Sequence, residues 1–143
     1  MSTQSWHHRF LDLAKLVSSW SKDPSTKVGA VIVDTKNRIV SIGFNGFPVG
    51  IDDDNRLSDR MLKYEIIVHA ESNAIMFANK SLENCTLYTY PFEPCSRCAS
   101  IIIQSGITKV VTLKNQTDRW EKDFELSRQL FKETNITLEY LHD

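Results

Sequence analysis

The chain has 143 residues, of which 41% are hydrophobic and 24% charged, and its formal net charge is −1. It can bury one core, and it lacks both the basic excess that binds long nucleic acid and the roughly 20-residue apolar run of a membrane span. Because the segment Met1 to Arg9 is polar, we expect no signal peptide and a cytoplasmic location. Three cysteines, an odd number, favour metal binding or catalysis over a disulfide framework in that compartment.

Hydrophobic periodicity predicts the secondary structure, and no linker or repeat divides the chain, so one domain over residues 1–143 is expected. In chain order we expect a helix over 6–20, strands over 28–33 and 39–44, a long polar loop over 45–60, a helix over 69–80, a strand over 85–90, a helix over 95–104 closed by Gly106, a strand over 107–113, a helix over 120–133 and a strand over 136–140. Strand–helix–strand steps need crossover connections. The fold class is therefore α/β, with a mixed sheet covered by helices.

Two short motifs lie at the predicted starts of two helices, His69-Ala70-Glu71 and Pro94-Cys95-Ser96-Arg97-Cys98. Cysteines spaced i, i+3 in the first turn of a helix point both sulfurs the same way, as a tetrahedral metal requires. His69 completes three ligands if the two helices begin side by side. Nitrogen and sulfur ligands select zinc, and three of them leave a fourth position for water, so we expect one Zn²⁺ per chain.

Glu71 gives this metal site a catalytic interpretation. Zinc lowers the pKa of a bound water to roughly 7, so hydroxide becomes available at neutral pH. Glu71, two residues after His69, is positioned to take the water proton and pass it on. The two motifs together are the signature of zinc nucleobase deaminases, which predicts hydrolytic deamination.

A closed structural zinc site is the alternative interpretation of the same residues. Such a site needs a fourth ligand, and the other candidates are Cys85, His7, His8 and His142. Cys85 begins a predicted strand, where a buried, inert thiol is expected instead.

Five stretches of the chain lie in an order and spacing typical of one family. They are SKDPSTKVGAVIV (21–33), GFNGFPVG (43–50), HAESNAI (69–75), PCSRCA (94–99) and IIIQSGI (101–107). The chain thereby resembles the deoxycytidylate (dCMP) deaminases of the cytidine deaminase-like superfamily. The metal motif is specific to the superfamily, whereas the Gly-x-Asn-Gly-x-Pro-x-Gly loop and the Asn-Ala-Ile continuation narrow it to the dCMP branch.

The resemblance implies a fold, a reaction and a mode of regulation. The fold is the three-layer cytidine deaminase-like sandwich, a five-stranded mixed sheet with helices on both faces. The reaction is the deamination of dCMP to dUMP, which supplies thymidylate synthesis. Family members are commonly homohexamers, activated by dCTP and inhibited by dTTP with Mg²⁺ accompanying the nucleotide, and these properties are expectations for this chain.

The resemblance also assigns residues to the substrate. Asn45 matches the family's nucleotide-contacting asparagine, and its amide can hydrogen-bond the deoxyribose hydroxyl. Val28 and Ala70 are expected to line the base pocket. The candidate donors to the 5′-phosphate are Ser25, Lys27, Lys114 and Arg119. The candidate effector residues are Gly46, Gly50 and Asp52.

This sequence departs from the family pattern at several places. Phe44 stands where a tyrosine is usual, and the segment before Cys95 is one residue longer than the common pattern, which affects the pocket wall expected from Tyr90, Phe92 and Glu93. The loop over 50–68 lacks the cysteines and histidines that give some relatives a second zinc.

Two other functions are alternatives to deamination of a mononucleotide. A deaminase of transfer RNA or single-stranded polynucleotide needs a basic, aromatic-lined groove, which the net charge of −1 and the four aspartates between residues 52 and 59 disfavour. A noncatalytic nucleotide-binding scaffold on the same fold would have no need for Glu71.

Overall fold

The computed structural model describes residues 5–114 and 119–142. Its elements are α1 (Trp6–Ser18), β1 (Gly29–Val33), β2 (Ile39–Phe44), the 3₁₀ helix η1 (Asn55–Ser58), α2 (Arg60–Ile66), α3 (Ala70–Phe77), β3 (Thr86–Tyr90), α4 (Ser96–Ser105), β4 (Lys109–Leu113), α5 (Glu121–Glu133) and β5 (Thr137–Leu141). The five strands form one mixed sheet, so the predicted α/β class is confirmed.

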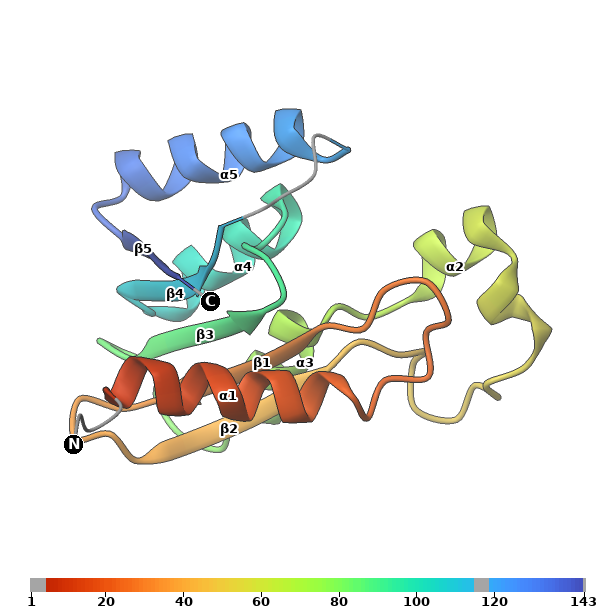
Figure 1. Cartoon of the computed structure of the whole chain (residues 1–143), viewed down its shortest axis with the longest axis horizontal. Coiled ribbons are helices and arrows are strands. Elements are labelled where there is room, and N and C mark those ends of the chain that lie inside the picture. The colour runs from red at the N-terminus through yellow and green to blue at the C-terminus, as the bar shows by residue number, and fades with distance from the viewer. Residues whose placement is uncertain (1–4, 115–118, 143) are drawn as a thin grey trace.

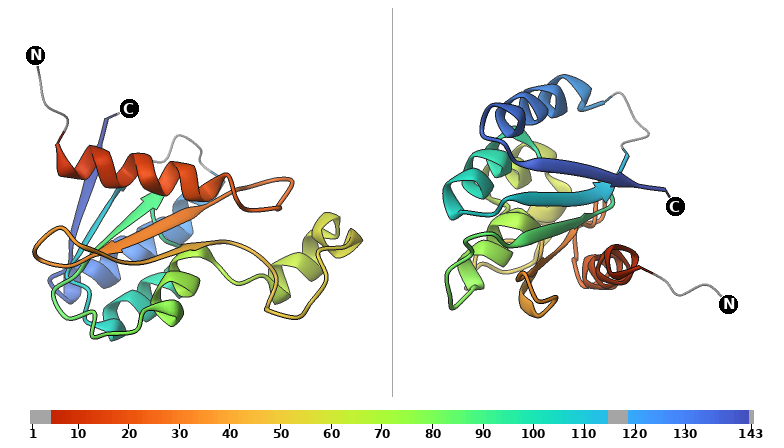
Figure 2. Two further views of the ribbon diagram at one scale, coloured as in Figure 1. Left: turned by 90° about the horizontal axis from the view of Figure 1, so that it is seen from below. Right: turned by 90° about the vertical axis from the view of Figure 1, so that its left-hand side faces the viewer.

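The sheet has the strand order β2-β1-β3-β4-β5. Strand β1 pairs antiparallel with β2 and β3, whereas β3, β4 and β5 run parallel to one another. Helix α1 covers one face, and α3, α4 and α5 cover the other (Figures 1 and 2). The predicted three-layer arrangement is therefore confirmed.

Each face of the sheet has its own hydrophobic core. On the α1 face the buried residues include Phe10, Ala14, Val31, Tyr88 and Val111. On the opposite face they include Ala30, Ile32, Leu87, Ile102, Val110 and Phe131. The residues of β1 are all buried because both of its faces are covered.

Glycine sets the position of α3 against the sheet. A Cβ added at Gly43 on β2 would lie 2.5 Å from the Ala70 carbonyl oxygen and 2.5 Å from the Ala74 nitrogen. Strand and helix therefore pack backbone to backbone, which only glycine allows. The start of α3, which carries one of the two chemical motifs, is held close to the sheet as a result.

The prediction of one polar loop over 45–60 was wrong for its second half. Asp54 and Asp59 cap η1 and α2, their carboxylates accepting from the Arg56 and Leu62 amides. Helix α2 lies beyond one end of the sheet (Figure 1), and its one buried residue is Lys63. It therefore lacks the apolar stripe that periodicity detects.

Two further helix ends test the sequence-based boundaries. Helix α3 ends at Phe77 and not at Lys80, because Ala78 adopts an extended backbone with φ −70° and ψ 135°. Helix α4 ends at Gly106 as predicted, with φ 95° in the left-handed region. Among residues 5–114 and 119–142, no helix is long and apolar enough to cross a membrane.

Candidate active site

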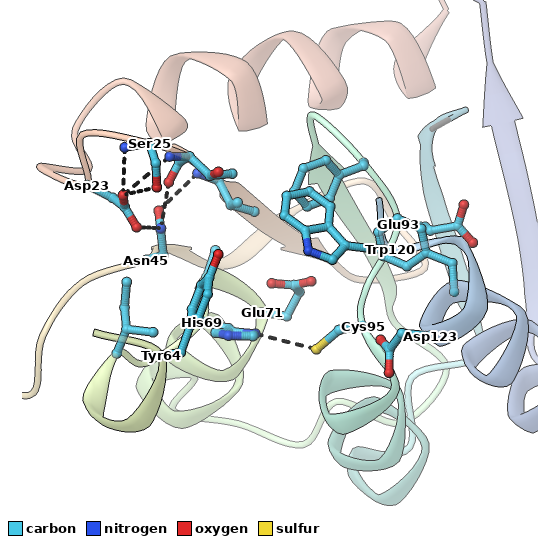
Figure 3. A pocket seen from close by; sticks show the side chains of 16 residues that line it. Asp23, Ser25, Asn45, Tyr64, His69, Glu71, Glu93, Cys95, Trp120 and Asp123 are labelled. Carbon is cyan, nitrogen blue, oxygen red and sulfur yellow. Dashed lines mark hydrogen bonds between the residues drawn. The ribbon is translucent and has the colours of Figure 1, made fainter. Parts of the chain in front are cut away.

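A pocket of about 210 Å³ opens where β1 begins, β3 ends and α3 and α4 start. Loop residues before β1, α2 and the start of α5 close its remaining sides (Figure 3). The lining residues are Asp23, Ser25, Thr26, Val28, Asn45, Tyr64, Ile67, His69, Ala70, Glu71, Phe92, Glu93, Cys95, Trp120, Asp123 and Phe124.

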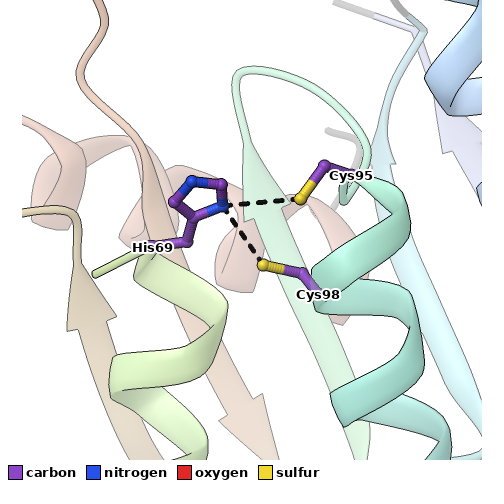
Figure 4. Close-up of side chains that lie close together, drawn as sticks. All are labelled: His69, Cys95 and Cys98. Atoms are coloured by element: carbon purple, nitrogen blue, oxygen red, sulfur yellow. Dashed lines mark hydrogen bonds between the residues drawn. The ribbon is translucent and has the colours of Figure 1, made fainter. Parts of the chain in front are cut away.

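His69, Cys95 and Cys98 lie close together (Figure 4), and the first two of them line this pocket. His69 is the N-cap residue of α3, and Cys95 is the N-cap residue of α4. The two helix starts lie side by side, which places His69 Nδ1 3.4 Å from Cys95 Sγ and 3.3 Å from Cys98 Sγ. The sequence prediction that these three residues come together is confirmed.

The spacing of these three ligand atoms fits a tetrahedral zinc ion. Zn–N and Zn–S bonds of the usual length, set at a tetrahedral angle, separate the ligand atoms by roughly 3.6 Å. The two nitrogen–sulfur distances in the structure lie close to that value. Within the described part of the chain, the group contains only these three residues, and Cys85 is buried elsewhere at the start of β3. The arrangement supports an open site over a closed four-ligand one.

The electrostatics of the site favour the thiolate form of one cysteine, Cys95. Hydrogen bonds from the Cys98 thiol and from His69 hold the pKa of Cys95 well below its usual range. The hydrogen bond with Cys95 in turn raises the pKa of His69. A thiolate is the form of cysteine that binds metal, and the amides at the start of α4 stabilise its charge.

Glu71 is the buried acid of the site. Its side chain is 5% exposed and lines the pocket beside His69 and Cys95 (Figure 3). Burial, followed by the negative charge of Cys95, raises the pKa of Glu71 to about 7. A carboxyl group with this pKa both accepts and releases protons near neutral pH.

A hydrogen-bonded turn centred on Asp23 forms the opposite rim of the pocket. Asp23 Oδ1 accepts from the Ser25 amide at 2.9 Å and from the Thr26 amide at 3.3 Å. Lys63 Nζ donates to the same oxygen from α2 at 3.0 Å. Burial raises the pKa of Asp23, but these hydrogen bonds outweigh it and the net pKa is lowered.

Aromatic side chains form the wall between the metal ligands and α5. The Phe92 and Trp120 rings meet edge to face with centroids 5.1 Å apart, and Phe124 packs 5.8 Å from Phe92. Such a wall offers an apolar, stacking surface to a planar heterocycle. Phe92 and Glu93, which are expected in the wall, do line the pocket, whereas Tyr90 does not, because it packs against the core on the α1 face of the sheet.

The predicted base and sugar residues fall in the pocket. Val28 and Ala70 line it, as does Ser25 from the phosphate set. Asn45 also lines it, but its amide is engaged within the protein: Oδ1 accepts from the Val28 amide at 2.9 Å, and Nδ2 donates to the Thr26 carbonyl at 2.9 Å. Asn45 therefore shapes the rim itself, and its contact with a sugar stays a prediction.

The predicted cations lie outside the pocket lining. Lys27 donates to the Ser21 carbonyl, and Lys114 is exposed at the end of the segment described before residue 119. Arg119 lies nearest: its guanidinium stacks 4.8 Å from the Trp120 ring and donates to the Tyr64 hydroxyl at 3.3 Å. Arg119 thus contacts two residues of the pocket wall.

The predicted effector residues also lie outside the pocket lining. Gly46 pairs with Val68 in an isolated β-bridge, directly before His69. Gly50 has a φ of 91° and, like Asp52, is exposed.

Sequence reasoning does not identify several residues that line the pocket or contact its rim. Asp23 was interpreted only as part of a turn, and Lys63 and Tyr64 lie on a helix that was not predicted. Trp120 and Asp123 come from the start of α5, about 25 residues beyond the cysteine motif. The Asp-Pro-Ser-Thr run at 23–26 carried a usable signal, since an aspartate there caps its own turn.

Comparison with known proteins identifies deaminases with a zinc-binding region, in agreement with the geometry of the site. Residues 4–114 match the family model described as the cytidine and deoxycytidylate deaminase zinc-binding region. An uncharacterised deaminase of the luxG 3′ region of Aliivibrio fischeri is 45% identical over 139 residues, covering 95% of this chain and 93% of that protein. The deoxycytidylate deaminase of Mus musculus is 41% identical over 139 residues, covering 92% and 77%.

A solved structure shares the fold. The dCMP deaminase of the cyanophage S-TIM5, crystallised with dCMP and dUMP, superposes with a TM-score of 0.74 at 22% identity. The match covers 99% of this chain and 100% of the phage chain.

Proposed function

We propose that this chain, which belongs to the cytidine and deoxycytidylate deaminase family, hydrolyses dCMP to dUMP and ammonia. The observation that carries the proposal is the cluster of His69, Cys95 and Cys98 beside a pocket that also contains the buried Glu71. The names of the relatives, and the nucleotides bound by the phage enzyme, support dCMP as the substrate.

The side chains of the pocket account for the proton transfers of this reaction. Zinc held by His69, Cys95 and Cys98 would supply hydroxide at neutral pH. Glu71 transfers one proton of the water to the ring nitrogen, where it remains, and then a second proton, from the hydroxyl added to the ring carbon, to the leaving amine. Water adds across the ring carbon–nitrogen double bond next to the exocyclic amine. The amine then leaves as ammonia, and a carbonyl forms at the carbon that carried it.

The rest of the pocket orients the nucleotide. The base lies against the wall of Phe92, Trp120 and Phe124. Asn45 Oδ1 retains a second lone pair that can accept from the sugar hydroxyl. For the phosphate, Ser25 at the rim and Arg119 beside Tyr64 are the first donors to test, ahead of Lys27 and Lys114.

The resemblance to the dCMP deaminases extends the proposal to regulation and assembly. A homohexamer, activation by dCTP and inhibition by dTTP with Mg²⁺, a role in supplying dTMP and a cytoplasmic location are proposed on that basis. The loop with Gly46, Gly50 and Asp52 is the proposed effector site. Its link to the catalytic pocket is the bridge from Gly46 to Val68, the residue before His69.

A substrate panel tests the proposed function. Zinc-loaded protein is incubated with dCMP, CMP, cytidine, dCTP and an adenosine-containing RNA hairpin, and ammonia release is followed with and without added dCTP and Mg²⁺. We expect turnover of dCMP above the other compounds. Turnover confined to the hairpin would indicate a polynucleotide deaminase, and no turnover under any condition would indicate a noncatalytic scaffold.

A further inference from the structure

Helix α5 packs on α4 next to the metal site, yet it lies outside the region that matches the family model (Figure 1). That region ends at residue 114 and contains all three metal ligands, whereas α5 spans Glu121–Glu133. The contacts of α5 with the cysteine motif therefore come from outside the matched zinc-binding region.

The position of Cys95 is not fixed by the hydrogen bonds of α4 alone. Cys95 is the N-cap residue, with an extended backbone at φ −70° and ψ 170°, whereas Cys98 lies inside the first turn. An N-cap residue is only half inside its helix, so its neighbours on both sides decide where its side chain points.

Two side chains of α5 hold those neighbours. Asp123 accepts from the Ser96 amide at 2.9 Å and from the Ser96 hydroxyl at 2.6 Å. Ser127, 1% exposed, donates its hydroxyl to the Pro94 carbonyl at 2.9 Å. The residues directly before and after Cys95 are thus both hydrogen-bonded to side chains of α5.

A third side chain of α5 anchors the turn one residue earlier. Arg128 Nε and Nη2 donate to the two carboxylate oxygens of Glu93 at 2.8 and 2.9 Å. Glu93 is 1% exposed, and Tyr140 on β5 donates to it as well, at 3.1 Å. A bidentate arginine–carboxylate pair fixes orientation as well as distance.

We propose that α5 is a clamp for the metal site, in which Asp123, Ser127 and Arg128 are positioning residues that hold the Glu93–Ser96 turn so that Cys95 points at His69. The clamp rests on the zinc site of the proposed function. Second-layer contacts of this kind usually set metal affinity and coordination geometry.

Zinc affinity and coordination geometry test the clamp without any substrate. The variants are Asp123→Ala and Arg128→Met, with Asp123→Asn and Arg128→Lys as conservative partners that retain part of each interaction. Gln129→Ala, on the exposed side of α5, is the control on the same helix. Phe10→Leu, in the core of the opposite face, is the control for lost global stability. Zinc dissociation constants come from chelator competition, geometry from the visible spectrum of the Co²⁺ form, and stability from thermal unfolding.

We expect Asp123→Ala and Arg128→Met to weaken zinc binding by roughly 10- to 100-fold and to shift the Co²⁺ bands. The conservative variants should lie in between, and both controls should stay within about threefold of the wild type, including Phe10→Leu at a matched loss of stability. Zinc affinities unchanged in Asp123→Ala and Arg128→Met, or lowered equally in Phe10→Leu, would overturn the clamp. A wild type that binds no zinc would overturn both proposals, whereas one that binds zinc but leaves dCMP unchanged would overturn the proposed function and not the clamp.

Discussion

Lys63 on α2 and Asp23 before β1 form a buried ion pair, with Nζ 3.0 Å from Oδ1 and side chains that are 3% and 4% exposed. Lys63 also donates to the Ser25 hydroxyl at 2.6 Å. Since Asp23 and Ser25 line the pocket, the pair connects the outlying helix α2 to the substrate-binding rim.

Replacing Lys63 with methionine should therefore affect both stability and substrate binding. Removing one partner of a buried pair leaves an uncompensated charge, and we expect the free energy of unfolding to fall by about 3 kcal/mol. We expect KM for dCMP to rise roughly tenfold, about 1.4 kcal/mol, with a smaller change in kcat because Glu71 lies apart from Asp23 and Ser25, toward Cys95 (Figure 3). Denaturant unfolding and steady-state kinetics measure the two effects. An unchanged KM in folded Lys63→Met would show that the pair has no part in binding.

The same pair predicts a pH dependence of stability. The folded-state pKa of Asp23 is lowered, so its contribution is present above the unfolded pKa of about 3.9 and is lost as the pH falls through the lower folded value. The difference in unfolding free energy between wild type and Lys63→Met should therefore have its maximum value at pH 7 and decrease below about pH 4. In an Asp23→Asn background the Lys63→Met effect should not vary with pH. A difference that stays constant in the wild-type background down to about pH 3 would contradict this assignment.

Gly43 and Gly46 offer a matched pair of substitutions. A Cβ at Gly43 meets the backbone of α3 at 2.5 Å, whereas a Cβ at Gly46 meets nothing within 4 Å. Gly43→Ala should push the start of α3 away from the sheet, lowering unfolding free energy by about 2 kcal/mol or more and weakening zinc binding through His69. Gly46→Ala should stay within about 0.5 kcal/mol of the wild type. Thermal unfolding and zinc content measure both, and equal behaviour of the two variants would refute the packing argument.

The metal motif and the sheet could be predicted because their signals are local. His69 and Glu71 are two residues apart, and Cys95 and Cys98 share one helical turn, so spacing alone gives their geometry. The Lys63–Asp23 pair joins residues 40 positions apart, and Lys63 lies on a helix whose buried residue is charged, which reverses the usual pattern. Trp120 reaches the pocket only through the packing of α5 on α4, which no short motif encodes.

The rate of dUMP formation from dCMP by zinc-loaded wild type and Glu71→Gln tests the central claim most directly. Glutamine keeps the size of the side chain but cannot carry the proton, so the variant should retain one zinc per chain by metal analysis and lose about a thousandfold in kcat. Formation of dUMP by Glu71→Gln within tenfold of an active wild type would contradict the assigned role of Glu71, and no dUMP from the zinc-loaded wild type would contradict the function itself.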